Sequence, residues 1–172
     1  MNEQYRLPES VAVGHVHLIV SDVERSLAFY RDILGFHVSE DMRTEPNPRK
    51  VVFLTANDAD HHHVALMEMM MLQPYPQGHL GLFHIAFLYP TRYELALALK
   101  HILDQGYPID HCHDYATGEA INLRDPDGIP LELYYSLPPE TWPRVDGQIR
   151  VINRKIEAEE ILQALEQERQ PG

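Results

Sequence analysis

The sequence predicts an α+β fold in which a single chain carries two βαβββ modules and a C-terminal helix. The main observation is an internal repeat. Two segments, one from His15 to Phe36 and one from His84 to Tyr107, share the same order of features. Each has an apolar strand that opens with a histidine, then a polar cap, an amphipathic helix and a glycine–aromatic stop. A second observation is that three strand patterns follow each helix. Because a repeat usually reflects a duplicated structural unit, the two histidines are expected to meet where the units face each other, at a place where a metal could be held.

In the first module, residues 11–20 are rich in Val and Ile, as in a strand that is buried on both sides. The helix that follows is expected to begin at Ser21 or Asp22 and to end at Gly35. Three further apolar runs are separated by turn residues. These runs predict strands at 36–42, 50–56 and 62–70.

The second module repeats this order. A strand at 83–89 leads to a helix whose first residues, Thr91 and Glu94, have the spacing of a capping box. Three strands are then predicted at 107–113, 119–124 and 130–136. Residues 138–152 contain Pro and are expected to be irregular, and a last helix over about 153–168 is expected to serve as a packing arm or dimer contact.

The organisation that follows is one domain over 11–137. It consists of a first module at 11–80 and a second at 81–137, with an N-terminal arm at 1–10 and an extension at 138–172. A chain of 172 residues is long enough for one substantial core. The net charge of −12 argues against a nucleic-acid or anionic-membrane partner. With one cysteine, no apolar run long enough to cross a membrane and no signal-peptide pattern, the protein is expected to be cytoplasmic.

Two histidines and one carboxylate can hold Fe(II) on one face and leave other positions open for substrate and oxygen. His15 and His84 occupy equivalent places in the repeat, and Glu132 is flanked by apolar residues on a strand near the end of the second module. A lone Glu on such a strand is more often an edge or solvent-facing residue. The matched histidines favour the metal site instead.

The segment His15–Phe36, with its Ser-Leu-x-Phe-Tyr run and Leu-Gly-Phe stop, resembles the opening module of the vicinal oxygen chelate superfamily. The resemblance extends to His84-Ile85-Ala86, to the turn 125–128 and to Glu132. That superfamily includes glyoxalase I, bleomycin and fosfomycin resistance proteins and extradiol dioxygenases. The resemblance implies an open barrel around a metal held by His15, His84 and Glu132, with His17 as a neighbour of the ligand.

Within the superfamily, the run His61-His62-His63 is similar to a segment of the extradiol dioxygenases, and the small single-chain catechol 2,3-dioxygenases are the most similar branch. This resemblance implies Fe(II), with Mn(II), Ni(II) or Zn(II) as alternatives, and a small aromatic diol that is cleaved with O2. It implies that His62 acts as acid and base and that His113 or Tyr115 hydrogen-bonds a substrate oxygen. One departure is Asn122, which stands where these enzymes usually have a tyrosine.

Two other functions remain possible at this stage. A glyoxalase-like isomerase or lyase would use a fourth ligand, for which Glu68 is the candidate. Strand alternation would place His62 and Glu68 on one face, and only one end of that strand can lie near the metal. The other alternative is a drug-binding resistance protein without catalysis, although such proteins have generally lost the ligand set. A homodimer is the expected assembly.

Overall fold

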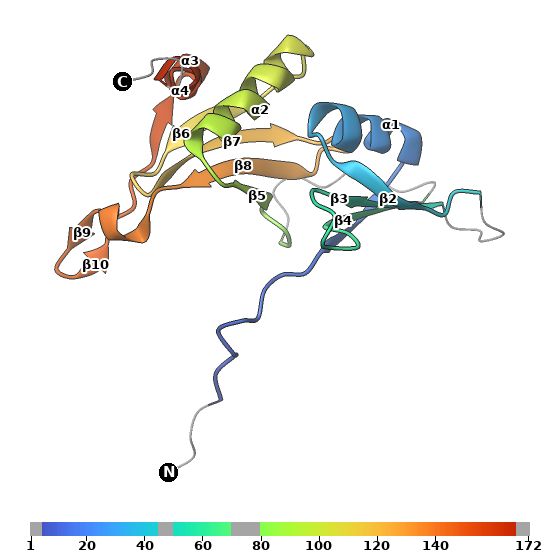
Figure 1. Cartoon of the computed structure of the whole chain (residues 1–172), viewed down its shortest axis with the longest axis horizontal. Coiled ribbons are helices and arrows are strands. Elements are labelled where there is room, and N and C mark those ends of the chain that lie inside the picture. The colour runs from blue at the N-terminus through green and yellow to red at the C-terminus, as the bar shows by residue number, and fades with distance from the viewer. Residues whose placement is uncertain (1–4, 45–49, 70–79, 168–172) are drawn as a thin grey trace.

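The computed structural model describes residues 5–44, 50–69 and 80–167, and it contains two modules of the predicted kind (Figure 1). The first module comprises β1 (Val16–Val20), α1 (Val23–Ala28) with a π-helical continuation (Phe29–Ile33), β2 (His37–Asp41), β3 (Val51–Thr55) and β4 (Val64–Glu68). The second comprises β5 (Ile85–Tyr89), α2 (Arg92–Asp104), β6 (His111–Asp114), β7 (Gly118–Arg124) and β8 (Pro130–Ser136). The α+β prediction with two βαβββ units is therefore confirmed.

Both modules have the same strand order. The first forms a four-stranded sheet, β1-β4-β3-β2, and the second has the corresponding order β5-β8-β7-β6. A fifth strand, β11 (Arg154–Ile156), is added at the outer edge of β6. In each, the opening strand is parallel to the closing one, β1 to β4 and β5 to β8, while the other neighbours are antiparallel. The helices α1 and α2 lie over the same side of the two open sheets, which leaves the opposite faces uncovered by helices (Figure 1).

Side-chain alternation explains which face of each strand carries the core. On β1, Leu18 and Val20 are buried beneath α1, whereas His17 and Ile19 are exposed on the other face. Asp22 caps α1 by accepting the Glu24 and Arg25 N–H groups, as predicted for this position. Polar side chains such as His17 are therefore accessible on the face of the sheet that no helix covers.

The turn after β7 joins the modules. Asp127 accepts hydrogen bonds from the Ser21 backbone and hydroxyl and from the Arg25 guanidinium at the start of α1. The buried Asp125 accepts one from the Tyr30 hydroxyl at 3.3 Å. Two aromatic contacts, Phe29–Tyr107 and Phe36–Phe87, continue the junction at ring-centroid distances of 4.7 and 5.3 Å. These contacts link the two sheets into one body.

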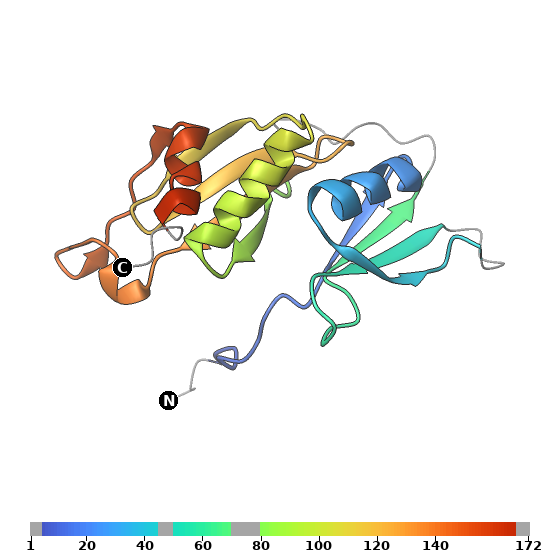
Figure 2. The same ribbon diagram turned by 45° about the horizontal axis from the view of Figure 1, so that its top comes forward.

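The predicted helix over 153–168 is wrong in its first part. Residues 154–156 form strand β11 (Arg154–Ile156), which pairs antiparallel with β6 and buries Ile156. Only then do two short helices follow, α3 (Ala158–Leu162) and α4 (Ala164–Gln167), and they pack on α2 as the predicted packing arm (Figure 2). Residues 154–156 have a helical sequence pattern but form a strand, because they pair with the edge of β6 that would otherwise be free. Strand pairing of this kind depends on residues that are distant in the sequence.

Smaller differences occur elsewhere. Strand β1 begins at Val16 instead of residue 11, because its partner β4 begins at Val64; residues 5–15 form an exposed arm. The irregular stretch after β8 contains a 3₁₀ turn (Pro139–Thr141) and a small hairpin, β9 (Arg144–Val145) and β10 (Gln148–Ile149). The end of the strand predicted at 62–70 and the predicted module boundary at 80–81 adjoin residues 70–79, which lie outside the described residues. Among the helices described, none is long and apolar enough to cross a membrane.

Candidate metal centre

The second sheet brings two of the predicted ligands together. Glu132 on β8 pairs with Ala86 on β5, and His84 lies two residues before Ala86, so both side chains project from the face opposite α2. His84 Nε2 is 3.5 Å from Glu132 Oε2, and Glu132 is only 7% exposed. Two ligands about 2.1 Å from one ion lie about 3–3.4 Å apart, so this pair fits two positions around a metal.

Tyr115 fixes the orientation of Glu132. Its hydroxyl donates to Glu132 Oε1 at 3.2 Å, while Oε2 of the same carboxylate faces His84. Burial raises the pKa of Tyr115, and the Glu132 charge acts in the same direction, so the phenol keeps its proton for this bond. Because the Tyr115 hydroxyl already donates its proton to Glu132, Tyr115 is a partner of the carboxylate in this structure and not a free donor for substrate.

Two polar groups beside Glu132 have unused hydrogen-bonding capacity. Asn122 lies directly opposite Glu132 in the β7–β8 pairing, and His113 lies on the next strand, with its ring 5.7 Å from that of Tyr115. In the part of the chain that the structure describes, His113 Nδ1 and Asn122 Nδ2 are buried without a hydrogen-bond partner. Burial lowers the pKa of His113, with the neighbouring His111 acting in the same direction. Buried groups of this kind usually serve a ligand or an ordered water.

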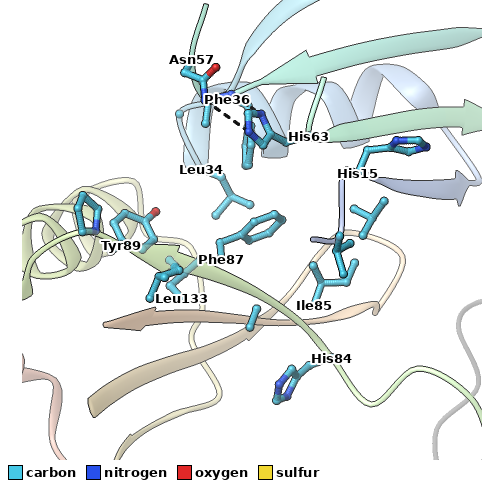
Figure 3. Close-up of a pocket in the computed structure, with 18 of the residues that line it drawn as sticks. His15, Leu34, Phe36, Asn57, His63, His84, Ile85, Phe87, Tyr89 and Leu133 are labelled. Carbon is cyan, nitrogen blue, oxygen red and sulfur yellow. Dashed lines mark hydrogen bonds between the residues drawn. The ribbon is translucent and has the colours of Figure 1, made fainter. Parts of the chain in front are cut away.

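His15 lies apart from this pair. It precedes β1 in the first module, is exposed, and packs its ring on His62 at a centroid distance of 4.4 Å. Figure 3 shows that His15 and His84 come from different modules and do not point toward one another. Within the three described ranges, no group of three His, Cys, Asp or Glu side chains surrounds a common metal position. The structure thus brings together His84 and Glu132, and it leaves His15 outside.

His62 lies beside His15, the residue for which the resemblance implies a role as a ligand. Besides His15, its ring contacts Phe53 at 4.8 Å, on the face of the first sheet that is opposite α1, and His61 at 5.0 Å. Burial lowers the pKa of His62, and the charges of the neighbouring histidines, His15 first, lower it further. His63 has a different role, because its Nδ1 is bonded to the Thr55 hydroxyl and accepts the Ala56 N–H.

Glu68 does not share a face with His62, contrary to the expectation from alternation, because His62 precedes β4 and lies in the loop before it. Glu68 ends β4, binds Lys50 Nζ at 2.7 Å and accepts the Val23 N–H at the start of α1. The two ends of β4 are about 13 Å apart, and the His62 end is the one beside His15. Glu68 therefore acts as an ion-pair partner and helix-terminal acceptor.

A cleft of about 840 Å³ lies between the modules (Figure 3). We call it the inter-module cleft. His15 and His84 both line it, together with Leu34 and Phe36 from the first module and Phe87 from the second. The two predicted histidine ligands, one from each module, thus border one continuous space.

Sequence reasoning missed two features of the site. The ring of His111 contacts that of His113 in a tilted arrangement at a centroid distance of 4.6 Å, and His111 pairs opposite Asn122. The signal was present in the sequence, since residues two apart on a strand share a face. The second feature is the use of Asp127 to dock the second module on α1, which no local pattern indicates.

Comparisons with known proteins identify the family of the chain. A family model described as "Glyoxalase/Bleomycin resistance protein/Dioxygenase superfamily" matches residues 12–133. A "Catechol-2,3-dioxygenase" of Bacillus subtilis (strain 168) is 32% identical over 164 residues, which cover 94% of this chain and 54% of that protein. A "Manganese-dependent 2,3-dihydroxybiphenyl 1,2-dioxygenase" of Geobacillus genomosp. 3 is 27% identical over 133 residues, which cover 75% of this chain and 38% of that protein.

The chain therefore spans about half or less of the length of these two relatives. Among solved structures, a glyoxylase/bleomycin resistance protein/dioxygenase domain from Frankia sp. EAN1pec superposes with a TM-score of 0.64 at 20% identity, covering 74% of this chain and 98% of that one. At this identity the structural match shows the fold alone.

Proposed function

Because the chain belongs to the Glyoxalase/Bleomycin resistance protein/Dioxygenase superfamily, we propose that it is an extradiol ring-cleavage dioxygenase that acts on an aromatic diol with O2. The observation that carries the proposal is the pair His84 Nε2–Glu132 Oε2 at 3.5 Å, with Tyr115 on the other carboxylate oxygen. Two relatives named as dioxygenases, one of catechol and one of a dihydroxybiphenyl, support the reaction type.

The proposed metal is Fe(II), held by His84, Glu132 and His15, with Mn(II) as the first alternative because one relative is named as manganese-dependent. Imidazole and carboxylate suit such divalent ions. The bound ion would supply Lewis acidity and redox chemistry toward the diol and oxygen. In this structure His15 lines the same inter-module cleft as His84 without pointing toward it, and it would complete the ligand set from the first module.

The remaining residues have separate proposed roles. Tyr115 holds Glu132 in place through Oε1. His113 and Asn122, with buried and unpartnered nitrogens beside Glu132, are proposed to hydrogen-bond the oxygens of the substrate. His62, in contact with His15, is proposed as the acid and base that moves a proton during ring cleavage.

The test is a ring-cleavage assay with matched variants. The chain is loaded with Fe(II) under argon and then mixed with catechol, 3-methylcatechol or 2,3-dihydroxybiphenyl in air, and the yellow ring-opened product is followed. We expect colour with the wild type and with Glu68→Gln, and none with Glu132→Ala or His62→Ala. Absence of colour from a wild-type chain that holds one metal ion would overturn the proposal.

A further inference from the structure

The inter-module cleft begins beside the proposed metal centre and leads away from it. Strand β5 forms an edge of its sheet and pairs with β8 alone among the described strands, so its other edge borders the cleft. His84 and Leu88 line the cleft from the Glu132 face of β5, whereas Phe87 lines it from the face toward α2. The cleft therefore passes from the metal side of β5, around its free edge, to the junction of the modules.

The walls of the cleft are mostly apolar. In the described part of the chain, no Asp, Glu, Lys or Arg lines it, although the protein has a net charge of −12. Side chains of Leu34 and Phe87 point into it in Figure 3. His63, one of its few polar residues, already has its Nδ1 occupied by Thr55 and Ala56. A charged or strongly polar group would lose its hydration in this space without finding a counter-charge.

The size of the cleft exceeds what a single ring needs. At about 840 Å³ it falls within the ~300–1,000 Å³ range of pockets that enclose drug-sized ligands. A monocyclic diol bound at His84 and Glu132 would leave most of this apolar volume in contact with water. A substituent that fills it would gain affinity in proportion to the apolar area that it buries.

We propose that the inter-module cleft binds a bulky apolar substituent on the aromatic diol, so that the substrate is an aryl- or long-alkyl-substituted catechol and not catechol itself. This inference rests on the proposed function. The diol oxygens lie at the His84–Glu132 end, and the substituent extends along the edge of β5 toward Phe36 and Phe87.

The test compares equilibrium binding of two diols. The dissociation constants of 2,3-dihydroxybiphenyl and catechol are measured by calorimetry on the full, Fe(II)-loaded chain under argon, where no turnover occurs. We expect the bicyclic diol to bind at least tenfold more tightly. Leu88→Asp places a charge in the cleft at a position that is 66% exposed and is expected to abolish most of this preference. Leu97→Asp on α2, at a 44% exposed position outside the cleft lining, is the matched control and is expected to keep it.

A second measurement separates the cleft from the metal. On the metal-free chain, 2-hydroxybiphenyl is expected to bind at least tenfold more tightly than phenol, with the same sensitivity to Leu88→Asp. Equal affinities for the members of each pair, or a preference that survives Leu88→Asp, would overturn the cleft assignment. If catechol is nevertheless cleaved in air, the proposed dioxygenase function stands and only the assignment of the cleft fails. If the holoprotein binds neither diol, both proposals fail.

Discussion

The two modules share one frame and differ in the chemistry that they carry on it. In each, a histidine comes directly before the first residue of the opening strand, and that strand is parallel to the closing one. The modules differ at the second residue of the opening strand. In the second module this residue, Ala86, pairs with Glu132 of the closing strand, whereas in the first module His17 pairs with Ala65. The repeat has thus kept the histidine in both modules and the carboxylate in one.

This difference shows that the frame and the chemistry depend on different positions. Core residues and the glycines that end the helices recur in both halves, with Gly35 and Gly106 both at positive φ angles of 84° and 67°. The first module has a glutamate as well, but Glu68 is bound to Lys50 and to the start of α1. This difference supports the proposal of one metal centre per pair of modules, built on the second sheet.

The largest effect is expected from exchanging one glutamate of this comparison for glutamine. Glu132→Gln removes the charge of a proposed ligand but keeps the shape of the side chain. We expect metal affinity to fall by more than about 100-fold, which exceeds the loss usually caused by mutating a residue that only hydrogen-bonds a ligand. Glu68→Gln should leave metal affinity within about threefold of the wild type, because Glu68 has other partners. Competition with a chromogenic chelator measures both. Equal losses in the two variants would contradict the division between the modules.

The next effect concerns Tyr115, which the first module does not duplicate. Tyr115→Phe removes the hydroxyl that donates to Glu132 Oε1 and should weaken metal binding by about 10–100-fold, with the fold unchanged. Tyr135→Phe, on the same strand as Glu132 but on the face toward α2, serves as the control. If the affinity of Tyr115→Phe equals that of the control, Tyr115 does not position the carboxylate.

The predictable part of this molecule is the part encoded locally. The Asp22 and Thr91 caps, the glycine stops and the histidines directly before β1 and β5 were all visible as short patterns. What could not be predicted depends on distant partners. Strand β11 forms because the edge of β6 is free, and Glu68 turns toward Lys50 and Val23. The convergence of His15 with His84 and Glu132 was also expected from the sequence, and it stays a prediction about the loaded protein.

A third prediction breaks the link between the modules. Asp127→Ala removes the acceptor for Ser21 and Arg25 at a position that is only 12% exposed, and should lower the free energy of unfolding by about 1–2 kcal/mol. For a chain of this size that corresponds to a fall in Tm of about 2–8 °C. The control is Asp32→Ala, because Asp32 pairs with Arg31 on the solvent-exposed surface of one module, where an ion pair contributes little to stability. Matching Tm values for the two variants would mean that the turn does not hold the modules together.

The smallest effect is expected at the Lys50–Glu68 pair, where the first module uses its glutamate for stability. The bond from Lys50, followed by the one from the Val23 N–H, lowers the pKa of Glu68 below its ordinary value of 4.5. Stability from a lowered carboxyl pKa is present above the ordinary value and is lost as the pH falls through the lowered one. Urea unfolding of the wild type and of Glu68→Gln should therefore differ at pH 7, and the difference should narrow as the pH falls below 4.5 and through the lowered pKa. Since Lys50 is half exposed, the difference at pH 7 should be smaller than that caused by Asp127→Ala. A gap between the two unfolding curves that is the same at pH 3 and pH 7 would show that Glu68 contributes through packing and not through its charge.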